Sequence, residues 1–164
     1  MKKLLLTIAF LVSVLWCYEM PLPPAPAKTE IIVEFSPGNL QKYIVEKKIR
    51  HPHIVYAQAL LETGEFTSTI FKENNNLFGM KYVGDFRYKY GRPTTAVGSK
   101  YGHAVYTHWK KSVDDYILWQ QMFKKTPTEK EDEYFALLRK KYAEDTRYVA
   151  VLKTIIKKDT VRWE

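Results

Sequence analysis

The sequence predicts one α+β domain, mainly helical, with a small β-hairpin lobe flanking a cleft. Helical apolar spacing dominates both ends of residues 36–159, whereas residues 77–106 alternate aromatic and β-branched side chains with Gly and Pro. A chain of 164 residues with 46% hydrophobic content suits a single core. A helical body with a sheet segregated to one side leaves a cleft between the two parts.

Helix start and stop signals predict the bounds of the elements that precede the hairpin in the sequence. The Ser-Pro pair at residues 36–37 predicts an N-cap and a first helical turn. A second helix is expected over residues 51–64, with Gly64 as its C-terminal stop. A short third helix is expected over residues 67–73, because three asparagines follow it. The segment before the first helix reads as a short strand or an extended lead-in.

Three further helices are expected after the hairpin. The first covers residues 111–125, with Ser112 as N-cap and Asp115 three residues later, close to a capping box. The second opens at Thr128, and the third covers residues 144–159. One face of the third carries Val149, Leu152, Ile155 and Ile156.

The N-terminal residues carry export signals. Residues 1–17 place two lysines before a short apolar run, which predicts a signal peptide or an N-terminal anchor. Cys17 ends this run, but Trp16 before it fits a lipoprotein signal poorly. The Pro-rich residues 18–35 predict a tether, leaving residues 36–164 as the domain. We therefore expect an exported protein, periplasmic or associated with the cell envelope.

The net charge and the composition restrict the classes of binding partner that this chain is expected to have. The net charge of +8 favours a polyanion: nucleic acid, acidic lipid or an anionic wall polymer. Export argues against nucleic acid, and membrane contact is expected only through an uncleaved signal or a lipid anchor. No zinc spacing or phosphate-binding glycine loop is recognisable, so neither a metal nor a cofactor is predicted. The histidines read as exposed or internally bonded residues: His51, His53, His103 and His108.

Carboxylates are the remaining candidates for catalytic side chains, and Glu62 is the one in a distinctive position. It falls in the last turn of the second predicted helix, next to Leu60 and Leu61. Apolar neighbours and the negative end of the helix dipole both raise the pKa of a carboxyl. A raised pKa suits the general acid of glycosidic bond cleavage. Gln58 lies on the same face and could orient Glu62 or touch a sugar. A solvated surface glutamate is the alternative on these features.

Several blocks resemble a known family. Residues 57–64 match an Ala-Gln-x-x-x-Glu-[ST]-Gly core, and residues 75–81 match Asn-Asn-Leu-Phe-Gly-[IM]-Lys. Residues 103–119 and 142–156 resemble two later blocks, in family order. The family is that of bacterial cell-wall endo-β-N-acetylglucosaminidases, of the glycoside hydrolase family 73 type, which includes the muramidase domain of the flagellar rod-cap protein. The resemblance implies a lysozyme-like fold.

The resemblance also implies an activity and a set of site residues. The expected protein is an exported peptidoglycan hydrolase that cuts β-1,4 bonds, on the reducing side of N-acetylglucosamine. Glu62 takes the place of the catalytic acid, and Tyr142 that of a cleft tyrosine near the reacting sugar. The other candidates for substrate contact, some of them equally well placed as core, are Gln58, Asn76, Phe78, Tyr106 and Trp109.

One departure from the family concerns the second acid, which many members carry in the hairpin. Here residues 80–111 contain one acidic residue, Asp85, and its spacing matches no family motif. Asp85 could serve. Otherwise the N-acetyl group of the substrate could assist, or Tyr142 could position water. A binding-only peptidoglycan module, and a muramidase or lytic transglycosylase on a related fold, are further alternatives.

Overall fold

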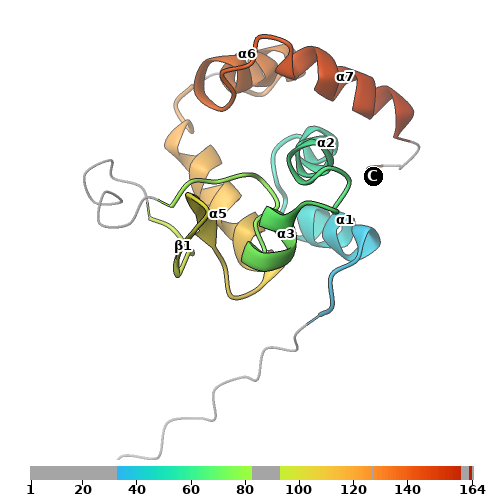
Figure 1. The fold of residues 1–164 in the computed structure, drawn as a ribbon. Coiled ribbons are helices and arrows are strands. Elements are labelled where there is room, and N and C mark those ends of the chain that lie inside the picture. Colours follow the sequence, from blue (N-terminus) through green and yellow to red (C-terminus); the bar gives the residue numbers. More distant parts are fainter. Residues whose placement is uncertain (1–32, 83–92, 127, 160–162, 164) are drawn as a thin grey trace, which may run out of the picture. The chain divides into compact units, whose positions relative to one another are not determined.

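The computed structural model describes residues 33–82, 93–126, 128–159 and 163, within one compact unit that spans Ile32–Glu164. Figure 1 shows the order of its elements, and the described ones confirm the predicted α+β class. The helices are α1 (Pro37–Glu46), α2 (Pro52–Thr63), α3 (Thr69–Asn74), α5 (Trp109–Met122), α6 (Glu131–Lys141) and α7 (Tyr148–Lys158). The strands are β1 (Gly98–Lys100) and β2 (His103–Val105).

Helix α1 begins where the sequence predicts, and helix α2 ends at the predicted stop. The Ser36 side chain accepts a hydrogen bond from the Asn39 N–H and caps α1. Helix α2 ends at Gly64, which adopts the left-handed conformation with φ of 54°. Glu62 therefore lies in the last turn of α2, at the negative end of its dipole.

The predicted start of α5 at Ser112 was wrong. This helix has His108 as its N-cap, so Ser112 lies inside it. Ser112 is fully buried, and its hydroxyl accepts a 3.0 Å hydrogen bond from the Leu77 N–H. Asp115 is also fully buried and accepts a hydrogen bond from the Thr95 N–H. The Ser-x-x-Asp pattern thus makes tertiary contacts in place of a capping box.

The predicted start of α6 at Thr128 was also wrong. Helix α6 begins at Glu131, with Lys130 as N-cap. Thr128 is fully buried, and its hydroxyl bonds the Arg50 side chain while its carbonyl bonds the His51 ring. Thr128 therefore bonds the connection between α5 and α6 to the start of α2, and it caps no helix.

The β lobe contains a two-stranded antiparallel hairpin, where the sequence allowed two or three strands. In its register Ser99 faces Ala104. Tyr101 and Gly102 both have positive φ, 55° and 71°, which is the geometry of a two-residue hairpin turn. The Ala104 N–H donates to the Met80 carbonyl over 2.8 Å, so β2 lies against the loop that follows α3.

Asn76 joins this loop to the hairpin. Its side chain is 1% exposed and donates to the carbonyls of Met80 and Ala104, both over 2.9 Å. Its amide oxygen accepts from the N–H groups of Phe78 and Met80. One side chain thus satisfies four backbone groups and sets the path of residues 76–80.

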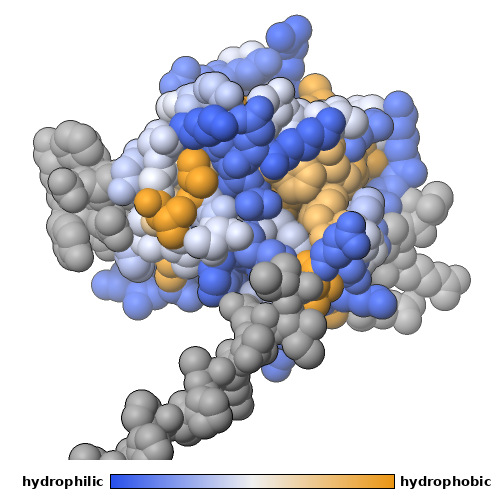
Figure 2. All heavy atoms as spheres, turned by 60° about the horizontal axis from the view of Figure 1, so that its bottom comes forward, coloured by the Kyte–Doolittle hydropathy of each residue, from blue (hydrophilic) through white to orange (hydrophobic). Residues whose placement is uncertain are grey.

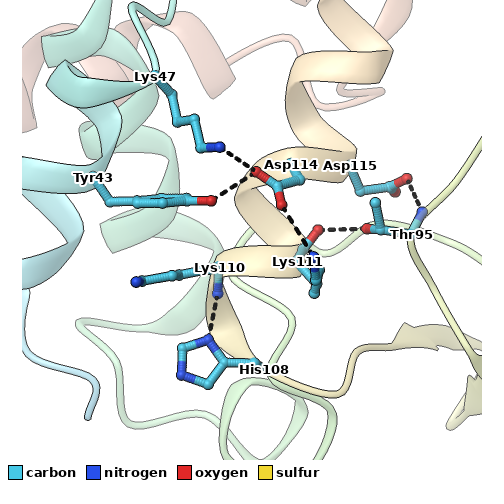
Figure 3. Close-up of polar contacts among 8 residues, drawn as sticks. All are labelled: Tyr43, Lys47, Thr95, His108, Lys110, Lys111, Asp114 and Asp115. Atoms are coloured by element: carbon cyan, nitrogen blue, oxygen red, sulfur yellow. Dashed lines mark hydrogen bonds and ion pairs between the residues drawn. The ribbon is translucent and has the colours of Figure 1, made fainter. Parts of the chain in front are cut away.

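A polar cluster joins α1 to α5. The Tyr43 hydroxyl donates to Asp114 over 2.9 Å, and Lys47 and Lys111 lie 3.7 and 3.8 Å from the same carboxylate (Figure 3). Figure 2 shows that hydrophilic side chains cover most of one face of the molecule, with smaller hydrophobic areas between them. None of the helices in the described ranges is both long and apolar enough to cross a membrane.

Replacing Asn76 tests its role in the fold. We expect Asn76→Ala to lower the free energy of unfolding by about 2–4 kcal/mol, because it leaves buried backbone groups without partners. Asn39→Ala is the control, since the Asn39 side chain makes an exposed hydrogen bond to the Glu34 carbonyl. Its expected loss is within about 0.5 kcal/mol. Urea denaturation measures both, and equal losses would contradict the role given to Asn76.

Candidate active site

A cavity of about 610 Å³ lies between the end of α2, the loop after α3 and the α6–α7 connection. Its size is within the range of small-ligand sites. Trp119 adds one wall from α5. The lining residues are Leu61, Glu62, Phe78, Gly79, Met80, Lys81, Trp119, Lys141, Tyr142, Ala143, Glu144, Asp145, Tyr148 and Val151.

Glu62 points its carboxyl into this cavity from the last turn of α2. Burial raises the pKa of this carboxyl, because removal from water disfavours the charged form. The hydrogen bond from Tyr148 lowers the pKa, but burial is the larger of the two effects. The result is an acid that stays protonated at higher pH than an exposed glutamate and faces open space.

Tyr148 is the site residue that sequence reasoning missed. It is the first residue of α7, is 8% exposed and donates its hydroxyl to Glu62 Oε1 over 2.8 Å. Burial raises the pKa of Tyr148 far above its usual range, so the phenol remains a neutral donor. The signal was available, because Tyr148 closes the same Tyr-Ala-x-Asp-x-x-Tyr block that opens with Tyr142.

Asp145 stabilises the turn that precedes Tyr148 at the start of α7. Its carboxylate accepts from the Arg147 N–H over 2.8 Å and from the Arg147 guanidinium. The same contacts hold the pKa of Asp145 below its usual range. The Tyr148 N–H donates to the Asp145 carbonyl, so the aspartate in this block fixes where α7 begins.

Gly79 brings the loop after α3 against the acid. It has φ of +59°, and a Cβ added there would lie 2.8 Å from Glu62 Oε2. Both the backbone conformation and the short approach require glycine. The Leu-Phe-Gly sequence therefore lets backbone close one side of the carboxyl.

Phe78 and Tyr142 line the cavity, as their predicted roles require. The Tyr142 hydroxyl donates to the Phe78 carbonyl over 2.6 Å, which ties the end of α6 to the loop after α3. Burial raises the pKa of Tyr142 well above its usual range. Phe78 is 1% exposed and packs its ring 4.4 Å from that of Tyr116, so it acts mainly as the floor.

Four residues predicted to contact substrate lie in the interior and do not line the cavity: Gln58, Asn76, Tyr106 and Trp109. Each makes its hydrogen bonds inside the protein. The Tyr106 hydroxyl donates to Asp115, and the Trp109 indole donates to the Val33 carbonyl. Because all four side chains are buried away from the cavity, their placement favours the alternative expectation, that they are core or orienting residues, over direct contact with a sugar.

The predicted second acid, Asp85, lies outside the described residues and stays a prediction. On the described lining, the other two carboxylates are Glu144 and Asp145, and both residues are exposed. Among the described residues there is no group of three or more His, Cys, Asp or Glu that could hold a metal ion.

Comparison with known proteins identifies the family. The sequence model of the glucosaminidase family, described as mannosyl-glycoprotein endo-beta-N-acetylglucosaminidase, matches residues 39–160. The chain belongs to this family and is a glycoside hydrolase. Its fold is similar to that of the catalytic domain of the autolysin Auto from Listeria monocytogenes, with a TM-score of 0.52 and 20% identity over 78% of this chain and 88% of that chain. No curated protein matched the sequence.

Gly79 offers a test of the site geometry. We expect Gly79→Ala to lower the rate of glycosidic bond cleavage about 100-fold, because the new Cβ displaces the Glu62 carboxyl. Gly102→Ala is the matched control, since Gly102 also has positive φ but has open space around its Cβ position. Both variants should lose about 1 kcal/mol of stability from backbone strain. Equal activities in the two variants would contradict the close approach at Glu62.

Proposed function

We propose that this chain is an exported peptidoglycan hydrolase in which Glu62 is the general acid. It would cleave the β-1,4 bond on the reducing side of N-acetylglucosamine. Membership of the glucosaminidase family and the likeness to an autolysin catalytic domain support the substrate class. The observation that carries the proposal is the half-buried Glu62 carboxyl, which lines a cavity of about 610 Å³ and has a pKa raised by burial.

The acid step follows from this geometry. Protonated Glu62 gives its proton to the glycosidic oxygen as the bond to the anomeric carbon breaks. Positive charge develops on the sugar, and Glu62 becomes a carboxylate. The Tyr148 hydroxyl already donates to Oε1 and stabilises that carboxylate as it forms. A water molecule then attacks the anomeric carbon, and its proton restores the acid.

The developing positive charge needs a partner. The two other carboxylates on the described lining are exposed, and Asp145 is paired with Arg147. We therefore assign the stabilising role to the N-acetyl group of the substrate, which would retain the anomeric configuration. Asp85→Asn tests the alternative: a loss of activity like that of Glu62→Gln would give the role to Asp85 instead.

The cavity walls suit a charged, peptide-bearing glycan. Trp119 and Tyr142 offer aromatic surface for sugar rings. The Tyr142 hydroxyl proton is committed to the Phe78 carbonyl, so its oxygen is left to accept from a sugar hydroxyl or water. Lys81 and Lys141 line the same cavity and attract an anionic polymer.

Export completes the proposal. Residues 1–17 would direct the chain out of the cytoplasm, residues 18–35 would act as a tether, and residues 36–164 would form the catalytic domain. This arrangement places the enzyme in the periplasm or at the envelope, where peptidoglycan lies. A muramidase or a lytic transglycosylase would instead leave a different reducing-end sugar or an anhydro ring, which mass spectrometry of the products distinguishes.

Replacing the acid tests the proposed function. We expect Glu62→Gln to lower the release of reducing ends from peptidoglycan sacculi about 1000-fold, because the amide cannot donate the proton. Glu65→Gln is the control: Glu65 is exposed, lies two residues beyond the end of α2 and does not line the cavity. Equal release by wild type and Glu62→Gln would remove Glu62 from the mechanism.

The rate of hydrolysis should depend on pH in a definite direction. The acid must be protonated, so the wild-type rate should fall as pH rises through the folded-state pKa of Glu62. Because burial raises this pKa, the fall should lie above the pH range in which an exposed glutamate titrates.

A further inference from the structure

A line of buried side chains extends behind the acid, away from the cavity. Gln58 Nε2 donates to the Tyr148 hydroxyl over 3.1 Å, and Gln58 Oε1 accepts from Tyr116. The hydroxyls of Tyr116 and Tyr134 lie 2.6 Å apart, and Gln120 Nε2 lies 2.6 Å from the Tyr134 hydroxyl. We call these four residues, Gln58, Tyr116, Tyr134 and Gln120, the amide–phenol chain. All four are buried, and none lines the cavity.

The far end of the amide–phenol chain is fixed by backbone. Gln120 Nε2 also donates to the Arg50 carbonyl over 3.1 Å. A rotated Gln120 amide would place its oxygen against that carbonyl, so the nitrogen must face both Arg50 and Tyr134. Gln120 can therefore only donate to the Tyr134 hydroxyl.

This anchor sets the direction of each later bond. Because Tyr134 accepts from Gln120, its own proton goes to Tyr116. The Tyr116 proton then goes to Gln58 Oε1, which turns Gln58 Nε2 toward the Tyr148 hydroxyl. Tyr148 is left to donate to Glu62. In the opposite direction, the Tyr134 proton would meet an amide nitrogen that cannot accept it.

We infer that the amide–phenol chain is a positioning device that holds Tyr148 as a hydrogen-bond donor to Glu62 Oε1 and so assigns the transferable proton to Oε2. This inference rests on the proposed role of Glu62 as the acid. Oε2 is the oxygen beside Gly79, in the part of the site that the loop after α3 closes. Bonds that point the same way also polarise one another, which strengthens the donation by Tyr148.

Other groups near Glu62 bear on its titration. Tyr148 and Tyr142 face it from α7 and from the end of α6, and both have pKa values raised by burial, so they stay neutral. The charged residues on the same cavity are Lys81, Lys141, Glu144 and Asp145. None belongs to the amide–phenol chain, so a change within the chain leaves these charges in place.

Removing one hydroxyl inside the amide–phenol chain tests the inference. In Tyr116→Phe, Gln58 Oε1 loses its donor, and the amide is free to turn and accept from Tyr148. Glu62 then loses its donor, so its acid dissociation constant should fall about threefold. Tyr148→Phe removes the donor itself and should lower the constant about tenfold. Tyr43→Phe is the matched control, since Tyr43 is a buried tyrosine whose hydroxyl bonds a different carboxylate, Asp114 (Figure 3).

The measurement is the ¹³C chemical shift of the Glu62 carboxyl against pH in the full chain, assigned by its absence in Glu62→Gln. The high-pH fall of the hydrolysis rate should move upward in the same order. Tyr134→Phe is the second variant, expected to shift the titration in the same direction by less, and it decides the matter if Tyr116→Phe does not fold. A Glu62 titration in Tyr116→Phe or Tyr134→Phe equal to that in Tyr43→Phe would overturn the inference. Because the titration needs no turnover, it stands apart from the test of hydrolysis.

Discussion

The hydrogen bond from Tyr148 to Glu62 is the contact on which the site depends. It joins the last turn of α2 to the first residue of α7, across 86 positions of sequence. It needs Gly64 to end α2 just after the acid, Asp145 to start α7 at the tyrosine, and Gly79 to let the loop approach. Burial raises the pKa of the acid and the tyrosine limits that rise, so the carboxyl can both give up and regain a proton.

The sequence blocks that resemble the family contain the residues that make the long-range hydrogen bonds around the site. Asn76 joins the Leu-Phe-Gly loop to the hairpin, and Ser112 holds the Leu77 N–H from α5. Tyr116, from the same block as Ser112, belongs to the amide–phenol chain. Each buried polar group would be costly alone, but each is satisfied by a partner from another block. The spacing within each block therefore reflects tertiary contacts that converge behind one carboxyl.

The sequence predicted the fold class and the acid for local reasons. Helical periodicity, the Ser36 cap and the Gly64 stop depend on neighbours in sequence, and these predictions were confirmed. The apolar neighbours of Glu62 likewise indicated its raised pKa. Burial of specific side chains depends on distant partners, so Trp109 and Tyr106 could not be separated from cavity-lining aromatics. The role of Ser112 was missed for the same reason, because a capping pattern has no local mark of a long-range bond. Tyr148 differs, since its place in the same block as Tyr142 could have indicated its role.

In the proposed mechanism, Glu62 meets the glycosidic oxygen inside this cavity. A crystal structure of Glu62→Gln with a peptidoglycan glycan fragment tests it most directly. We expect the fragment to lie against Tyr142 and Trp119, with the residue 62 side-chain amide within hydrogen-bonding distance, about 2.7–3.2 Å, of the scissile oxygen. A fragment seated instead in the separate groove lined by Tyr56 and Leu60, away from residue 62, would contradict it.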